Sequence, residues 1–162
     1  MFSTPDICDE FPDDVYACEL QFRSFGQHQR FSGQIETIKC FEDNSLVKQA
    51  LAEPGNGRVL VVDGGASLRR ALLGDQIALS AVKQGWSGLV FNGAVRDVDD
   101  LNTLAIGVKA LGCCPLKTEK RGEGQHSIDL HFGGVLFVTG HYLYADNNGV
   151  VVSQNNLLLH SG

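Results

Sequence analysis

Residues 58–63 read Arg58-Val-Leu-Val-Val-Asp63, and residues 88–92 read Gly88-Leu-Val-Phe-Asn92. Each is a short apolar run of the kind found in strands that are buried on both faces. Gly64-Gly65 breaks the first run, and apolar residues then recur at helical spacing from Leu68 to Gln84, with an interruption at Gly74-Asp75. This order of strand, helix and strand predicts a βαβ unit with parallel strands and a right-handed crossover.

The segments before this unit add further elements of an α/β fold. Thr4-Pro5-Asp6 combines a capping residue, a proline and an acid, which predicts a short helix that stops before Pro12. Phe31–Phe41 is rich in β-branched and aromatic residues and predicts a strand. Ser45–Glu53 carries apolar residues at helical spacing, so we expect a helix there, capped by Asn44.

The segments after the unit predict a polar helix and then mainly strands. The helix follows Arg96-Asp97 and runs to about Leu104, and a strand over Ile106–Cys114 is closed by Pro115. Lys117–Gln125 is charged and contains glycines, as in an exposed loop. Three apolar segments joined by turn residues predict a C-terminal β-meander: Ile128–Phe132, Val135–Val138 and Val150–Ser153.

Composition indicates one folded domain over residues 1–162, with 43% hydrophobic and 20% charged residues. The net charge of −6 and the lack of a basic run argue against direct nucleic-acid binding, because phosphate contacts need basic patches. No apolar stretch reaches the ~20 residues of a membrane helix, and the acidic Met1–Glu19 is not signal-like, which predicts a cytoplasmic protein. The five cysteines form no Cys-x-x-Cys pair and are expected to be small buried thiols.

Polar residues follow both strands of the βαβ unit, at the positions where an open parallel sheet binds its ligands. Asp63-Gly-Gly-Ala-Ser67 follows the first strand, and Asn92-Gly-Ala-Val-Arg-Asp97 follows the second. Both turns open onto the same edge of the sheet, so we expect their polar groups to converge there.

The helix between the two strands offers a site for an anion. Gly74 is expected to end one helical turn, and Asp75 is a favoured N-cap for a helix over Gln76–Gln84. A helix start exposes unpaired N–H groups and the positive end of the helix dipole, which bind a carboxylate or phosphate. The amides of Gln76 and Ile77 are therefore candidates for binding an anionic substrate.

Arg96 and Asp97 complete the candidate site. Arg96 would pair with a substrate carboxylate or with a developing enolate, and Asp97 would bind a hard divalent cation. Structural alternatives stay open, because Asp75 and Asp97 both fit helix caps and Arg96 fits a surface ion pair. Asp63-Gly-Gly lacks the Gly-x-Gly-x-x-Gly phosphate fingerprint and also fits a plain tight turn.

Several blocks of the sequence resemble one known family, the RraA and 4-hydroxy-4-methyl-2-oxoglutarate aldolase family, and they occur in the same order over nearly the whole chain. The blocks are Lys39-Cys-Phe-Glu-Asp-Asn44, Val59-Leu-Val-Val-Asp-Gly-Gly65, Leu68-Arg-Arg-Ala-Leu72, Gly93-Ala-Val-Arg96, Phe132-Gly-Gly-Val135 and Tyr144-Ala-Asp-Asn147. The resemblance implies a swivelling β/β/α-type fold with mixed sheets and flanking helices. It also implies a homotrimer, or a hexamer of two stacked trimers, with the active site near the subunit boundary.

Aldolase members of the family carry an aspartate, twenty further residues and then Arg-Asp, and here residues 76–95 separate Asp75 from Arg96-Asp97. The resemblance implies that Gly74, Asp75, Gln76 and Ile77 bind the pyruvoyl part of the substrate together with Arg96. It implies that Asp97 holds Mg²⁺ or Mn²⁺ and that Asp75 orients a metal-bound water.

The activity implied by the resemblance is metal-dependent cleavage of 4-hydroxy-4-methyl-2-oxoglutarate to pyruvate. Oxaloacetate decarboxylation is expected as a side activity, because it passes through the same pyruvate enolate. No residue of the sequence identifies the general base, and a water whose pKa is lowered by the metal is the preferred candidate. His141 replaces an acid that is frequent in the family, and the sequence assigns no consequence to this change.

Two other functions stay open at this point. In the first, the chain binds ribonuclease E through protein contacts and inhibits it without catalysis; its acidic charge suits a basic partner. The resembling family also contains regulators of ribonuclease E, which need not keep the Arg-Asp motif. The best-known type of regulator lacks the aspartate, so Arg96-Asp97 favours the enzyme. In the second, the chain is a ring-forming scaffold whose glycine-rich turns have no chemical role.

Overall fold

The computed structural model describes residues 1–160 and is built around a parallel sheet. Its four parallel strands lie side by side in chain order: β3 (Phe31–Lys39), β4 (Val59–Asp63), β5 (Gly88–Val95) and β6 (Gly107–Cys113). The short strand β2 (Arg23–Phe25) pairs antiparallel with β6 and forms the outer edge. Because the strands run in parallel, their carboxyl ends share one edge of the sheet.

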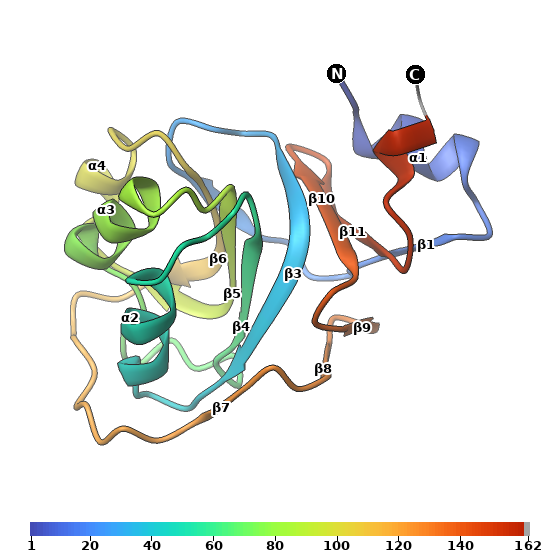
Figure 1. The fold of residues 1–162 in the computed structure, drawn as a ribbon. Helices are drawn as coiled ribbons and strands as arrows, with labels where there is room; N and C mark the ends of the chain where they lie inside the picture. Colours follow the sequence, from blue (N-terminus) through green and yellow to red (C-terminus); the bar gives the residue numbers. More distant parts are fainter. Residues whose placement is uncertain (161–162) are drawn as a thin grey trace.

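Three helices cover one face of this sheet, as Figure 1 shows. These helices connect successive parallel strands: α2 (Ser45–Leu51), α3 (Asp75–Lys83) and α4 (Val98–Leu101). One apolar cluster fills the space between sheet and helices, with Val47, Leu60 and Leu89 fully buried within it. The predicted βαβ unit is therefore confirmed as β4, α3 and β5.

A second sheet layer covers the opposite face. The first half of β3 pairs antiparallel with β10 (Tyr142–Asp146), and β10 continues into β11 (Gly149–Ser153) and β1 (Val15–Ala17). The separate hairpin of β8 (Leu130–Phe132) and β9 (Val135–Phe137) adds to this layer. Its aromatic and branched side chains pack against the rear of β3, β4 and β5 in a second apolar cluster. The resulting layers of strand, strand and helix confirm the predicted fold class.

The N-terminal helix α1 (Thr4–Glu10) lies beside the short 3₁₀ helix η1 (Leu157–His160) in Figure 1. Ser3 caps α1, because its hydroxyl accepts a hydrogen bond from the Asp6 amide; the predicted helix is confirmed but the cap lies one residue earlier. The Thr4 amide and hydroxyl both donate to the Asp146 carboxylate at 2.7 Å. This contact ties α1 to the end of β10.

Five details of the sequence interpretation are wrong. Leu68–Leu73 is not helical, and Asp75 is the first residue of α3 rather than its N-cap. The helix after Arg96-Asp97 ends at Leu101. The C-terminal strands do not form one meander, since β9 pairs with β8 alone, and the thiol of Cys113 is exposed.

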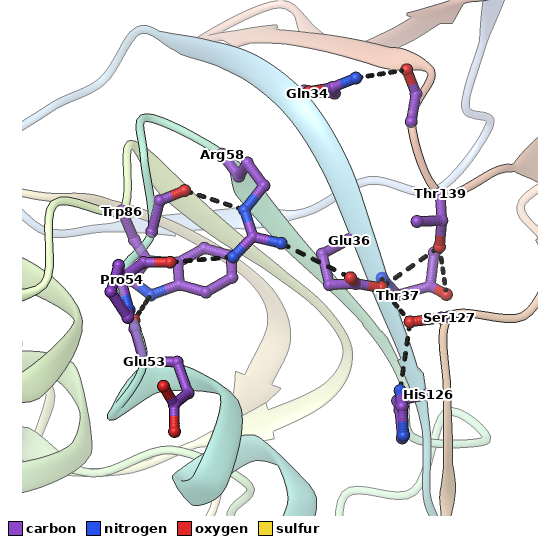
Figure 2. A network of polar contacts seen from close by, with 12 residues as sticks. Gln34, Glu36, Thr37, Glu53, Pro54, Arg58, Trp86, His126, Ser127 and Thr139 are labelled. Atoms are coloured by element: carbon purple, nitrogen blue, oxygen red, sulfur yellow. Dashed lines mark hydrogen bonds and ion pairs between the residues drawn. The ribbon is translucent and has the colours of Figure 1, made fainter.

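The amino edge of the parallel sheet is closed by a polar network, which Figure 2 shows. The Glu36 carboxylate accepts hydrogen bonds from the Thr37 amide, the Ser127 hydroxyl and the Thr139 hydroxyl. Its second oxygen lies 3.5 Å from the Arg58 guanidinium.

Within residues 1–160, no helix is long and apolar enough to cross a membrane.

Candidate active site

The turn after β4 meets β5 near the carboxyl edge of the sheet; the predicted convergence of Asp63 and Asn92 is confirmed, but Asn92 lies within β5 rather than after it. The Asn92 side-chain amide donates to Asp63 Oδ1 at 3.0 Å, and the Gly64 amide donates to the Asn92 carbonyl at 3.0 Å. Asp63 Oδ1 also accepts from the Gly65 amide at 2.9 Å. These groups satisfy one another's hydrogen-bonding capacity, so their role is structural. This favours the tight-turn interpretation of Asp63.

An extended segment connects the turn after β4 to the start of α3. The Leu72 amide donates to the Ala94 carbonyl at 2.8 Å, and the Arg96 amide donates to the Leu73 carbonyl at 2.9 Å. Ala71, Leu72 and Leu73 are all buried. Three consecutive buried residues cannot lie on the single apolar face of a surface helix, which explains why the segment is extended. Its path places Gly74 directly beside Arg96 and Asp97.

Asp97 has an unusual backbone conformation and reaches across to α3. Its φ of 57° and ψ of 41° lie in the left-handed region, which costs most residues about 1–2 kcal/mol and which Asp tolerates better than most. Asp97 makes no side-chain hydrogen bond to its own helix α4. Its Oδ2 instead accepts from the Asp75 amide at 3.0 Å. The aspartate therefore satisfies one of the free N–H groups at the start of a different helix.

The lack of a side chain at Gly74 permits this close approach. A Cβ atom at Gly74 would lie 2.7 Å from Asp97 Oδ2, closer than a carbon and an oxygen can pack. The glycine N-caps α3 in an extended conformation. The amides of Gln76 and Ile77 follow within the first turn of α3, where N–H groups have no acceptor in their own helix. The Asp75 carboxylate is solvent-accessible and accepts a long hydrogen bond, 3.4 Å, from the Gln76 side chain.

The Arg96 guanidinium has few strong protein partners. Its Nε lies 4.0 Å from Asp97 Oδ2, and its Nη1 lies 3.5 Å from the Pro115 carbonyl. The side chain is 38% exposed and that of Asp97 is 35% exposed, so the ion pair is screened and weak. Most of the guanidinium donors can therefore bind a ligand.

A small open pocket of about 250 Å³ lies at these residues. Its walls are formed by the end of β6 and the start of α4, with Arg96, Asp97, Val98, Cys113, Cys114 and Pro115 as lining residues. The part from β6 could not be predicted from the sequence, because Cys113-Cys114-Pro115 has no ligand-binding pattern. The position of these residues after a parallel strand was the available signal.

The donor set fits a hard, water-rich cation. Within residues 1–160, no group of three or more His, Cys, Asp or Glu side chains could hold a metal ion. Asp97 alone offers a carboxylate in the pocket, and its Oδ1 is free of protein donors among the described contacts. Mg²⁺ commonly binds proteins through one or two carboxylates and keeps several waters, whereas structural zinc needs a closed set of ligands.

His141 lies away from this pocket within the chain. Its carbonyl accepts from the Ile35 amide at 2.8 Å, and Ile35 pairs with Val59, the first residue of β4. This is the amino end of the parallel sheet, whereas Asp97 follows the carboxyl end of β5. His141 is therefore not part of this pocket.

Comparison with known proteins places these features in a family. The family model described as RraA-like, Aldolase/RraA, matches residues 4–152. The chain belongs to the Aldolase/RraA family. A Pseudomonas entomophila protein, provisionally named as a 4-hydroxy-4-methyl-2-oxoglutarate aldolase, is 56% identical over 96% of both chains. This membership confirms the resemblance that the sequence blocks indicate.

Two solved structures share the fold but carry different names. One is described as an S-adenosylmethionine:2-dimethylmenaquinone methyltransferase from Geobacillus kaustophilus; it is 46% identical, with a TM-score of 0.95 over 99% of this chain and 100% of that one. The other is described as the RNA-processing inhibitor RraA from Thermus thermophilis; it is 42% identical, with a TM-score of 0.93 over 96% of this chain and 94% of that one. Because these names differ, function must be argued from the site.

Proposed function

We propose that this protein is a divalent-metal-dependent aldolase that cleaves 4-hydroxy-4-methyl-2-oxoglutarate, with oxaloacetate decarboxylation as a side activity. One observation carries the proposal: the Asp75 amide donates to the Asp97 carboxylate at 3.0 Å. This contact holds the start of α3 against the Asp97 carboxylate, which lines a small pocket together with Arg96. The provisional aldolase names of relatives that are 53–56% identical also support it.

Substrate binding is assigned to the start of α3 and to Arg96. In this proposal the amides of Gln76 and Ile77, which follow Gly74 at the start of α3, bind the carboxylate of the pyruvoyl group. Arg96 donates to the same end of the substrate through its planar fork. The pocket volume of about 250 Å³ suits a small organic acid rather than a nucleotide-sized ligand.

Asp97 is the proposed ligand of Mg²⁺ or Mn²⁺. A cation there would supply positive charge that stabilises the negative oxygen of the enolate. Arg96 adds a second positive group, and the hydrogen bond from its backbone amide to the Leu73 carbonyl fixes its backbone beside the start of α3. The exposed oxygen of Asp75 can accept a hydrogen bond from water and so orient it near the substrate.

The bond changes are the same for both proposed substrates. In the aldol cleavage, the C4 hydroxyl loses its proton to a base, the C3–C4 bond breaks, and C4 becomes the carbonyl carbon of one pyruvate. The electron pair remains on C3 as the enolate of a second pyruvate, which is then protonated. In oxaloacetate the C3–C4 bond also breaks, but CO₂ leaves in place of pyruvate. Stabilisation of one enolate therefore serves both reactions.

The experiment is a measurement of pyruvate released from each substrate with added Mg²⁺ or Mn²⁺ and again with chelator. We expect metal-dependent release of two pyruvates per molecule of 4-hydroxy-4-methyl-2-oxoglutarate. Pyruvate release no faster than in buffer, with or without metal, would remove the aldolase proposal.

We also propose that the protein is a homotrimer, which can stack as a hexamer, with the site near the subunit boundary. Three large apolar side chains are about half exposed, and each follows a strand that ends at the carboxyl edge: Phe41, Leu68 and Leu116. Burial of such residues in a closed cyclic assembly is favourable. Light scattering should give a trimer or hexamer for the wild type, and a monomer would contradict this proposal.

A second candidate function is inhibition of ribonuclease E by protein contacts. The relative described as the RNA-processing inhibitor RraA favours it, as does the net charge of −6, which suits a basic partner. If the protein has this role, it should slow ribonuclease E without binding RNA. RNA binding that weakens steeply with salt would contradict the protein-contact mechanism.

A further inference from the structure

Arg23 is a second cation beside the candidate pocket, where it contacts one of the lining residues. Arg23 is the first residue of the edge strand β2, and it lies opposite Ala110 of the antiparallel neighbour β6. The guanidinium Nη1 lies 3.1 Å from the sulfur of Cys113, which itself lines the pocket beside Arg96 and Asp97. The side chain of Arg23 therefore reaches the carboxyl edge from the outer strand.

The side chain also lies on the correct face of the sheet. Phe25, two residues along β2, packs in the apolar cluster between the sheet and the helices. Alternate residues of a strand share a face, so Arg23 lies on the helix side, where α4 begins at Val98. The Arg23 guanidinium lies 5.2 Å from the centre of the Phe25 ring, a cation–π contact that restricts its orientation.

Arg23 differs from the other basic residues of this edge in its partners. Arg69 donates to the Glu42 carboxylate at 2.6 Å and 3.0 Å, and Arg70 donates to the Lys117 carbonyl at 3.1 Å. Within residues 1–160, no carboxylate lies at ion-pair distance from Arg23, whose only polar contact is a thiol, a weak acceptor. The guanidinium donors of Arg23 are thus free to bind an anion.

We infer that Arg23 binds the distal carboxylate of a dicarboxylic 2-oxo acid and so determines substrate specificity. The inference rests on the proposed function, in which the start of α3 and Arg96 bind the pyruvoyl end. A substrate such as 4-hydroxy-4-methyl-2-oxoglutarate has a second carboxylate, which needs a positive partner when it leaves bulk water. Arg23 supplies that charge beside Cys113, which lines the pocket together with Asp97.

The test compares two ligands of equal chain length that cannot undergo cleavage. 2-Oxoglutarate has both carboxylates, and 2-oxopentanoate lacks the distal one. Binding of each to the wild type is measured by titration calorimetry with Mg²⁺ present. We expect 2-oxoglutarate to bind roughly 10- to 100-fold more tightly, as a charge-assisted hydrogen-bonded pair would give.

In Arg23→Gln the two ligands should bind with about equal affinity, because 2-oxoglutarate binding weakens and 2-oxopentanoate binding does not. Arg23→Lys should keep part of the preference for 2-oxoglutarate. Arg30→Gln is the matched control, because it removes the same charge from a side chain that lies by Phe2, before the amino end of β3. With 4-hydroxy-4-methyl-2-oxoglutarate as substrate, Arg23→Gln should raise KM about tenfold and leave kcat nearly unchanged.

The outcomes separate this inference from the proposed function. A wild type that binds 2-oxoglutarate no more tightly than 2-oxopentanoate would overturn the role of Arg23, whatever its turnover. Equal ligand preferences in Arg23→Gln and Arg30→Gln would also overturn that role. A wild type that prefers 2-oxoglutarate through Arg23 but releases no pyruvate would remove the aldolase activity and support the dicarboxylate site.

Discussion

The two edges of the parallel sheet each hold an arginine near an acid, but the donors of the two arginines have different partners. At the amino edge, Arg58 donates from Nε to the Gly55 carbonyl and from Nη2 to the Pro54 carbonyl, both at 2.9 Å. The guanidinium also lies 4.6 Å from the Trp86 ring and 3.5 Å from Glu36. At the carboxyl edge, the contacts of the Arg96 guanidinium with described residues are longer, at 3.5 Å and 4.0 Å.

This difference distinguishes a structural arginine from one that is available for a ligand. The contacts of Arg58 in Figure 2 hold together the loops before β4 and β5 and leave it little capacity for another partner. A pocket of about 310 Å³ also opens beside Arg58 and Glu36, but both charges are already paired with protein groups. The smaller pocket at Arg96 is the better site, because its charged groups are incompletely paired.

Asp97→Asn should have the largest effect on the carboxyl edge. Asparagine keeps an oxygen that can accept from the Asp75 amide and tolerates the left-handed backbone conformation, but it loses the charge that binds a cation. We expect metal-dependent pyruvate release to fall by about 10³-fold, with a change in stability below about 1 kcal/mol. Turnover and urea unfolding measure the two effects.

Asp99→Asn serves as the control for Asp97→Asn, because Asp99 is an exposed acid in α4 and does not line the pocket. It should leave both turnover and stability near those of the wild type. If Asp97→Asn kept wild-type turnover that responds to Mg²⁺, Asp97 would be only a cap for α3.

Arg96→Lys should reduce turnover by about 10²-fold, the next largest effect. Lysine keeps the charge but loses the planar fork that binds a carboxylate in two places. Because the protein contacts of Arg96 are long, the melting temperature should shift by only a few degrees. Steady-state kinetics and thermal unfolding measure these changes, and a large fall in stability with nearly normal kcat would indicate a structural Arg96 instead.

The sequence predicts the parts of this comparison that depend on local patterns. Val59–Val62 is a continuous apolar run, and the structure buries all of it in β4. The convergence of Asp63 and Asn92 follows from the geometry of parallel strands and is confirmed by their 3.0 Å hydrogen bond. The closeness of Asp75 to Arg96-Asp97 was expected from the family resemblance, and their roles remain proposals.

Other parts depend on contacts that no local pattern encodes. The apolar residues from Leu68 to Leu73 fit helical spacing, but hydrogen bonds of this segment to Ala94 and Leu116 favour an extended path. Arg23–Phe25 is too short for a periodic signal, so neither β2 nor the position of Arg23 could be predicted. The capping of α3 by Asp97 joins residues 22 positions apart. It depends on the left-handed backbone conformation of Asp97, which no local sequence pattern predicts.

Arg58→Gln tests the amino edge and should affect stability rather than turnover. The substitution removes the cation–π contact with Trp86 and the ion pair with Glu36, and it weakens two hydrogen bonds to loop carbonyls. We expect a loss of about 2 kcal/mol in the free energy of unfolding, with kcat within about twofold of the wild type. A loss of activity without a loss of stability would contradict the contrast between the two edges.

Asp43→Asn should have the smallest overall effect of these substitutions. The pH dependence of the change in stability identifies its cause. Asp43 is buried beside the carboxyl edge, and burial raises the pKa of its carboxyl. Hydrogen bonds from the Ser45 hydroxyl and from the amides of Glu123, Ser45 and Arg121 outweigh burial and lower the pKa from 3.8 to about 2. These bonds attach the exposed loop at Arg121 and Glu123 to the start of α2.

The sign of the pH dependence follows from this lowered pKa. Because the folded pKa lies below the unfolded value, the stabilisation by ionised Asp43 is complete above about pH 4 and is lost as pH falls toward about 2. Asp43→Asn should therefore lose about 1 kcal/mol at pH 7, and its difference from the wild type should narrow between about pH 4 and pH 2. Urea unfolding at several pH values measures this difference, with Asp13→Asn as an exposed control of equal charge change. A difference that stayed constant over this range would show that Asp43 acts through packing alone.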